Sequence, residues 1–163
     1  MATAAKNLST YTLDGIQISK GARIGIVVSE WNEEITSALL SAAKEVLKEK
    51  LPDAELHIHH VPGSFELAQG AQWLFERLGV DGVICIGNVI RGETAHFDFV
   101  CQAASQGILH VGLNFSRACI FCVLTDDTIE QSRARAGGKY GNKGTEAAVT
   151  LIKMLALEQS LPS

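Results

Sequence analysis

The sequence contains no run of basic residues, and this absence argues against one large class of function. Its 163 residues include 14 lysines and arginines against 18 aspartates and glutamates, which gives a formal net charge of −4. Proteins that bind nucleic acids use clustered cations to neutralise phosphates. We therefore expect no nucleic-acid partner, although a local basic pocket stays compatible with this charge.

Long apolar segments are also missing. No stretch approaches the roughly 20 apolar residues that cross a bilayer, and residues 1–20 lack the apolar centre of a signal peptide. We therefore expect a cytoplasmic protein without a membrane partner. The chain is 47% hydrophobic and 20% charged, which is typical of a globular domain, and its length suits one domain.

The cysteines do not form an evident redox motif. Cys119-Ile-Phe-Cys122 has the C-x-x-C form, but redox motifs of this form lie where a strand meets the N-terminus of a helix. Here both cysteines fall within one expected strand, where they would point to opposite faces. We expect buried structural thiols.

Apolar runs typical of strands alternate along the chain with segments whose apolar residues have helical spacing. The expected strands are residues 23–29, 55–61, 82–87, 108–113 and 118–124, and the expected helices are residues 33–50, 67–78, 97–107, 128–136 and 147–155. Asn32 is the expected N-cap of the first helix. This order predicts a three-layer α/β/α sandwich around a mainly parallel sheet.

The expected domain spans residues 15–163, and residues 1–14 form an N-terminal extension. The first 21 residues have too little apolar pattern for a core element. They are either an extension or a strand given to a neighbouring subunit.

Chemically useful residues follow several of the expected strands. Ligands of open parallel sheets bind beyond the carboxyl ends of the strands. Trp31 and Phe65 would present aromatic faces there, while Ser64, Glu66 and Asn114 would offer hydrogen bonds. A planar heterocycle and a second, phosphorylated small molecule would fit together at such a rim.

The most informative run is Asn88-Val-Ile-Arg-Gly-Glu-Thr-Ala-His-Phe-Asp98, which follows an expected strand and opens a helix. The start of a helix offers free N–H groups and a positive dipole end to an anion such as phosphate. Arg91 would add a planar cationic fork, and His96 a group that exchanges protons near neutral pH.

Each of these residues also has an ordinary structural interpretation. Trp31 could cap the core, Glu66 could be a first-turn helix charge, His96 could be a solvated helix-start residue, and Gly92 could only permit the turn. The functional interpretation is favoured because all of them gather at one sheet edge.

Two further features suggest ligands less strongly. His57 and His59 share a strand face, but no acidic or thiol partner is near in sequence, so we expect no metal site. The glycine-rich residues 136–144 lie between the last two helices, away from the strand ends. Their neighbouring cations Arg135, Lys139 and Lys143 would reach a rim only in an adjacent subunit.

Together these runs resemble the lumazine synthase family of riboflavin biosynthesis. The resemblance covers about residues 15–157 and rests on runs in the family's order and spacing. These runs are residues 29–32, 61–66, 87–98, 123–127 and 135–144.

The resemblance implies a flavodoxin-like sheet and a condensation between two small molecules, with no cofactor. The substrates are 5-amino-6-(D-ribitylamino)uracil and 3,4-dihydroxy-2-butanone 4-phosphate, and the products are 6,7-dimethyl-8-ribityllumazine, phosphate and water. The resemblance places the active site between two subunits of a pentamer. It also makes riboflavin synthase a candidate partner.

Roles for single residues come from the same resemblance. On one subunit, it implies that Trp31 stacks on the pyrimidine ring, that Val89 and Ile90 line the ring site, and that Ser64, Phe65 and Glu66 bind the ribityl chain. It also implies that Gly92, Glu93 and Thr94 form a turn that binds phosphate. His96 would be the general acid/base. The adjacent subunit would lend Phe121, Arg135 and Lys139, with Arg135 as the phosphate partner. Cys119 and Cys122 stand where the family commonly has small residues or proline.

Two other functions stay open at this point. One is a flavin-binding, flavodoxin-like module without turnover, suggested by the α/β pattern and the aromatic rim. The other is a structural protein that builds a hollow shell, because some family members assemble pentamers into icosahedra. Within the family that the chain resembles, a short link between the last two helices is compatible with the icosahedral form, so the resemblance implies a shell of 60 subunits.

Overall fold

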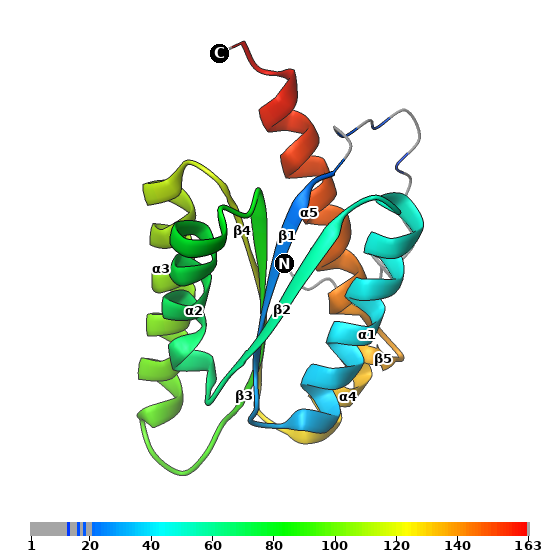
Figure 1. The fold of residues 1–163 in the computed structure, drawn as a ribbon. Helices are drawn as coiled ribbons and strands as arrows, with labels where there is room; N and C mark the ends of the chain where they lie inside the picture. Colours follow the sequence, from blue (N-terminus) through cyan, green and yellow to red (C-terminus); the bar gives the residue numbers. More distant parts are fainter. Residues whose placement is uncertain (1–12, 14–15, 17, 19–20, 163) are drawn as a thin grey trace.

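A four-stranded parallel sheet in the order β2-β1-β3-β4 forms the centre of the computed structural model, which describes residues 13, 16, 18 and 21–162 (Figure 1). The sheet strands are β1 (Arg23–Ser29), β2 (Glu55–Val61), β3 (Gly82–Ile90) and β4 (Ala118–Asp126). The longer helices are α1 (Glu33–Lys50), α3 (His96–Phe115) and α5 (Lys143–Ser160). Shorter elements are η1 (Ser64–Glu66), α2 (Leu67–Trp73), η2 (Leu74–Leu78), α4 (Ile129–Arg135), β5 (Ala136–Gly138) and β6 (Gly141–Asn142).

Helices cover both faces of the sheet, which confirms the predicted three-layer sandwich. Figure 1 shows α2 and α3 on one face and α1 and α5 on the other. Alternate residues of β1 divide between the two layers. Ile24 and Ile26 pack with α1 and α5, whereas Val27 packs with α2 and α3. Since each fully buried aliphatic side chain contributes about 1.5–3 kcal/mol, these central strands anchor the loops at their carboxyl ends.

Helix α3 corrects one sequence-based prediction. Residues 108–113 were expected to form a strand after a helix that ended at Gly107, but α3 continues through both to Phe115. An apolar run of this length is compatible with either element. A Cβ at position 107 would lie 2.8 Å from the Cβ of Ala68, so this glycine allows α3 to pack closely on α2. Asn114 therefore lies near the end of α3, remote from the rim where it was expected.

Helix α1 has the predicted bounds, but its N-cap differs from the expectation. Asn32 adopts a left-handed conformation with φ 58°, and its side chain makes no capping hydrogen bond. Instead its Nδ2 donates to the main-chain oxygen of Asn88 at 3.1 Å. This bond ties the loop after β1 to the carboxyl end of β3.

Helices α1 and α5 approach each other unusually closely at Gly144, in the first turn of α5. Asn142 caps this helix by accepting a hydrogen bond from the Gly144 N–H at 2.8 Å, and its Nδ2 donates to the main-chain oxygen of Ala38 at 3.2 Å. A Cβ at position 144 would collide with the main-chain carbonyl of Leu39. The glycine is therefore required by packing.

The glycine-rich segment between α4 and α5 forms the short antiparallel pair β5 and β6. Gly137 and Gly141 have φ values of 111° and 78°, in the left-handed region that favours glycine. The segment is thus a turn that joins α4 to α5.

The expected N-terminal extension, residues 1–14, lies outside the described residues except for Leu13, so the boundary at residue 15 stays a prediction. No helix among the described residues has both the length and the apolarity that a membrane crossing requires.

Candidate functional site

The carboxyl ends of β1 and β3, the segment after β2 and the start of α3 enclose one cavity of about 520 Å³. We call it the His96 pocket. It is lined by Trp31, Asn32, Gly63, Ser64, Phe65, Glu66, Asn88, Val89, Ile90, His96 and Val100. The structure thus brings together Trp31, Ser64, Phe65, Glu66, Val89, Ile90 and His96, as the rim argument predicted.

The aromatic side chains of this pocket are not core residues. Trp31 is 72% exposed and Phe65 is 60% exposed. A tryptophan that capped the core would be largely buried. These exposed rings make the ordinary interpretation of Trp31 wrong for this chain and offer flat surfaces for stacking.

Ser64 contributes a buried polar group to the same pocket. The residue is 5% exposed, and its hydroxyl oxygen has no hydrogen-bond partner among the described residues. A Cβ at position 87 would lie 2.6 Å from this oxygen, so Gly87 makes room for it. Because a buried hydroxyl without a partner is unfavourable, Ser64 is suited to bind a ligand.

The turn between β3 and α3 is open to solvent. Gly92, Glu93 and Thr94 are exposed, and Thr94 Oγ1 accepts a hydrogen bond from the main-chain nitrogen of His96 at 3.4 Å. Gly92 has no positive φ, and a Cβ there would meet no atom within 4 Å. Neither a left-handed backbone conformation nor packing among the described residues requires this glycine.

Arg91 does not supply the cationic fork that its position suggested. Its Nε donates to Asp127 Oδ1 at 2.9 Å, and its Nη1 lies 3.3 Å from Asp98 Oδ1. The hydrogen bond to Asp127 is the main reason that the pKa of Arg91 is raised. Its guanidinium also stacks over the ring of Phe97 at 4.1 Å. Arg91 is thus paired within its own chain.

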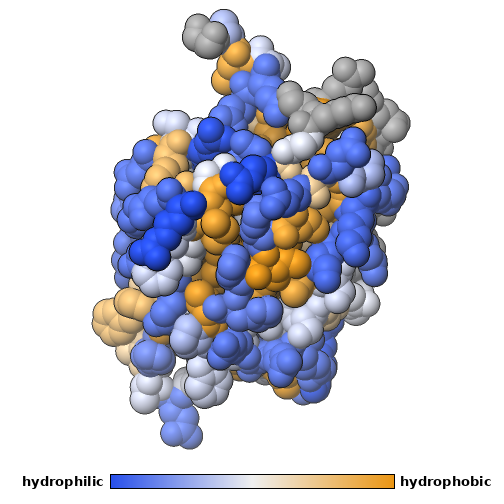
Figure 2. Space-filling model, in the orientation of Figure 1, coloured by the Kyte–Doolittle hydropathy of each residue, from blue (hydrophilic) through white to orange (hydrophobic). Residues whose placement is uncertain are grey.

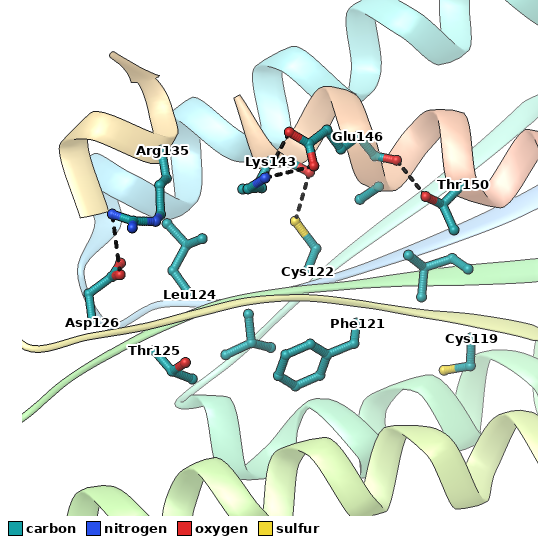
Figure 3. Close-up of a pocket in the computed structure, with 13 residues that line it drawn as sticks. Cys119, Phe121, Cys122, Leu124, Thr125, Asp126, Arg135, Lys143, Glu146 and Thr150 are labelled. Atoms are coloured by element: carbon teal, nitrogen blue, oxygen red, sulfur yellow. Dashed lines mark hydrogen bonds and ion pairs between the residues drawn. The ribbon is translucent and has the colours of Figure 1, made fainter. Parts of the chain in front are cut away.

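A second cavity, of about 600 Å³, lies along β4 between α4 and α5 (Figure 3). We call it the Arg135 pocket, and it has no lining residue in common with the His96 pocket. It contains Arg135 and Phe121, which the family resemblance assigned to the active site of a neighbouring subunit. Lys139 is exposed on the adjacent turn, where its Nζ lies 5.3 Å from the ring centre of Tyr140, and it does not line this pocket.

Two further charged residues line the Arg135 pocket: Lys143, which the sequence placed only among the cations near the glycine-rich segment, and Glu146, which received no role. Lys143 and Glu146 form an ion pair with an Nζ–Oε2 distance of 2.7 Å, and their side chains are 22% and 17% exposed. Figure 3 shows this pair above β4, on the same side as Arg135. Their spacing of three residues at a helix start was the available signal.

No set of three or more histidine, cysteine, aspartate or glutamate side chains within the described part of the chain is arranged to hold a metal ion. His57 Nε2 lies 3.2 Å from Glu55 Oε1 on the outer strand β2, so the expectation that no acidic partner is near this histidine was wrong.

Comparison with known proteins identifies the family of the chain. The family model for 6,7-dimethyl-8-ribityllumazine synthase matches residues 21–159. The chain belongs to this family.

Similar proteins named 6,7-dimethyl-8-ribityllumazine synthase occur in several bacteria. The one from Cytophaga hutchinsonii is 55% identical over 157 residues, covering 96% of this chain and 98% of the relative. The one from Christiangramia forsetii is 52% identical, covering 98% and 96%. The one from Porphyromonas gingivalis is 48% identical, covering 98% and 99%. As a member of the 6,7-dimethyl-8-ribityllumazine synthase family, the chain is an enzyme of the transferase class.

Cys119 and Cys122 lie on opposite faces of β4, as predicted. Cys119 Sγ lies 3.9 Å from Cys85 Sγ, whereas Cys122 Sγ lies 3.6 Å from the main-chain oxygen of Lys143. Burial raises the pKa of Cys122 to about 12. Contact with Cys119, together with burial, raises the pKa of Cys85 well above its usual value. Thiols held in the neutral form are poor nucleophiles.

Proposed function

We propose that the chain condenses 5-amino-6-(D-ribitylamino)uracil with 3,4-dihydroxy-2-butanone 4-phosphate to form 6,7-dimethyl-8-ribityllumazine, phosphate and water. This is the penultimate step of riboflavin biosynthesis. The observation that carries the proposal is the family match over nearly the whole chain, three of whose characteristic runs, residues 29–32, 61–66 and 87–98, converge on the His96 pocket.

In the His96 pocket, Trp31 stacks on the pyrimidine ring, Val89 and Ile90 line the ring site, and the run Ser64–Glu66 binds the ribityl chain. The exposed ring of Trp31 and the unpartnered hydroxyl of Ser64 support these roles. Clamping both substrates in one geometry raises their effective concentration.

His96 acts as the general acid/base, beside a phosphate turn made by Gly92, Glu93 and Thr94. Imine formation needs proton transfers as water leaves, and elimination of phosphate needs its charge to be held in place. The side chain is exposed at the first residue of a 20-residue helix, where backbone N–H groups and the helix dipole favour an anion.

Arg135, Phe121 and Lys139 complete the active site of the adjacent subunit. The support is geometric, because the Arg135 pocket and the His96 pocket share no residue. A pentamer brings these unlike surfaces together by rotation. The resemblance further suggests a 60-subunit shell.

Exposed apolar surface supports an assembly of this kind. A groove between α3 and α5 is lined by Leu109, Leu113, Met154, Leu157 and Leu161, which are 42–65% exposed. Figure 2 shows more apolar side chains at the surface of the face that carries β2, between hydrophilic regions. Apolar patches of this kind are typical of protein–protein contacts. The cytoplasmic location and an association with riboflavin synthase stay predictions.

The reaction is tested by mixing the two substrates with the purified protein and following lumazine absorbance. Product formation supports the enzyme. If the protein quenches riboflavin fluorescence but forms no lumazine, the chain is a flavin-binding module instead.

We expect the protein to sediment as a pentamer, with roughly five times the 17.5 kDa mass of the chain, or as a larger shell built from pentamers. Analytical ultracentrifugation distinguishes these forms, because a 60-subunit particle sediments far faster than a free pentamer. A stable monomer that retained full activity would contradict the shared site.

Replacing Arg135 with alanine should raise KM for the phosphate-bearing substrate about 10- to 100-fold, since a charge-assisted hydrogen bond is worth roughly 1.5–3 kcal/mol. KM for the pyrimidine substrate should change little. Steady-state kinetics with each substrate varied in turn measures both values.

Arg133 provides the matched control, because it lies on the same helix but donates to both carboxylate oxygens of Glu34, at 2.8 and 2.9 Å. Arg133→Ala should leave both KM values near those of the wild type. An equal rise in KM for both variants would mean that general loss of charge or stability is responsible.

A further inference from the structure

A buried chain of hydrogen bonds runs beneath α4 and ends beside Arg135. Asn88 Nδ2 donates to Ser132 Oγ at 2.9 Å, and Ser132 Oγ donates to Asp126 Oδ2 at 2.8 Å. The other carboxylate oxygen, Asp126 Oδ1, lies 3.7 Å from Arg135 Nη1. Figure 3 shows Asp126 and Arg135 facing each other at one end of the Arg135 pocket.

The network is well enclosed. Ser132 is 0% exposed, Asn88 is 2% exposed, and the side chain of Asp126 is 9% exposed. A carboxylate removed from water is costly unless hydrogen bonds and an opposite charge compensate it. Ser132 and Arg135 provide these two forms of compensation, so Asp126 has a defined orientation.

Three arginines near the pockets differ in how closely carboxylate oxygens approach their guanidinium N–H groups. Arg91 has carboxylate oxygens at 2.9 and 3.3 Å, and Arg133 has two at 2.8 and 2.9 Å. Arg135 has its carboxylate at 3.7 Å, beyond hydrogen-bond range, and Nη1 donates to the main-chain oxygen of Gln131 at 2.9 Å. The guanidinium of Arg135 is therefore held by the charge of Asp126, by the Gln131 carbonyl and by the ring of Tyr140, whose centre lies 5.2 Å from Cζ, and it has no carboxylate within hydrogen-bond distance among the described residues.

We propose that Asp126, fixed by Ser132 and Asn88, is a positioning residue that holds Arg135 in the orientation that binds the phosphate of the substrate. The inference rests on the proposed function and adds to it a residue that touches no substrate. A guanidinium already held in place loses less conformational entropy when it binds a phosphate.

The test is a double-mutant cycle between Asp126→Asn and Arg135→Ala in the assembled enzyme. Asparagine keeps the shape of aspartate and an acceptor for Ser132 but removes the charge that faces Arg135. We expect Asp126→Asn alone to raise KM for the phosphate-bearing substrate about tenfold, with KM for the pyrimidine unchanged. In the Arg135→Ala background the same substitution should add almost nothing, because coupled residues are not additive. An equal tenfold rise in both backgrounds, or no rise in either, would overturn the proposal.

Two further variants keep the test decisive. Ser132→Ala should raise KM for the phosphate-bearing substrate by a smaller factor than Asp126→Asn does. It replaces Asp126→Asn in the test if that variant does not fold. Glu130→Gln is the matched control, because this exposed carboxylate on α4 lies 3.7 Å from Arg133 and does not contact Arg135. It should leave both KM values unchanged.

Binding of inorganic phosphate, measured by calorimetry, separates this inference from the reaction itself. Weaker phosphate binding by Asp126→Asn than by the wild type would support the positioning role even if no lumazine forms. If the wild type and Asp126→Asn both form lumazine, with equal phosphate binding and equal kinetics, the proposed reaction is supported and the positioning role of Asp126 is rejected.

Discussion

Replacing His96 with alanine is expected to lower kcat about 100-fold. General acid/base catalysis is typically worth roughly 10²- to 10⁴-fold, and the lower end applies because His96 is exposed, so that water can take over part of the proton transfer. The fold should not change, since the side chain makes no core contact. The rate of lumazine formation at saturating substrates measures this effect.

His110→Ala is the control, because His110 is an exposed histidine further along α3. It should retain the wild-type kcat. If His96→Ala also retained it, the assignment of His96 as the proton-transferring group would be wrong.

Mixed assemblies extend this experiment to the shared site. The His96→Ala chain keeps Arg135, and the Arg135→Ala chain keeps His96. If equal amounts of the two chains assemble together at random, about one contact in four between adjacent subunits joins an intact His96 to an intact Arg135. Co-assembled protein should regain activity at those contacts, whereas variants that are assembled separately and then mixed should not. An absence of recovery in verified hybrids would place both residues in the same chain's site.

Gly144→Ala should have the largest effect on stability, lowering the free energy of unfolding by about 3 kcal/mol or more. The new methyl group would collide with the main-chain carbonyl of Leu39, and a backbone group cannot turn away as a side chain can. Separating α1 from α5 would also disturb both hydrogen bonds of the Asn142 side chain. The midpoint of urea denaturation, followed by circular dichroism, measures the loss.

Gly92→Ala is the matched control for stability alone, because a Cβ at position 92 meets no atom within 4 Å. Its midpoint should equal that of the wild type. An unchanged midpoint for Gly144→Ala would show that α1 can move away from α5 at little cost.

Local sequence signals predicted α1 well. Its apolar residues repeat with helical spacing, and Pro52 follows its end, so the expected bounds equal the observed Glu33–Lys50. The run 108–113 was misleading because Leu109 and Leu113 are apolar although they are 58% and 65% exposed, so the run resembles a buried strand. Only Ile108 and Val111 within it are buried, at helical spacing. The close contact of Gly107 with Ala68, which fits the continued helix, is tertiary and cannot be read from local sequence.

The rim of the His96 pocket could be predicted because parallel strands end at the same edge of a sheet. The loops that follow β1, β2 and β3 therefore had to converge. Pairing between charged residues could not be predicted in this way. Arg91 meets Asp127 only because β3 and β4 are neighbours, and Asp126 meets Ser132 only because α4 folds back over the end of β4.

The separation of the two pockets has a consequence for how activity depends on protein concentration. With the proposed shared site, a free subunit would be fully folded yet would carry only two unlike parts of an active site, each incomplete without a neighbour. On dilution below the dissociation constant of the assembly, specific activity should then fall while circular dichroism stays constant. Newly made chains would be inactive until they meet, so the onset of riboflavin synthesis would follow subunit encounter and not chain folding.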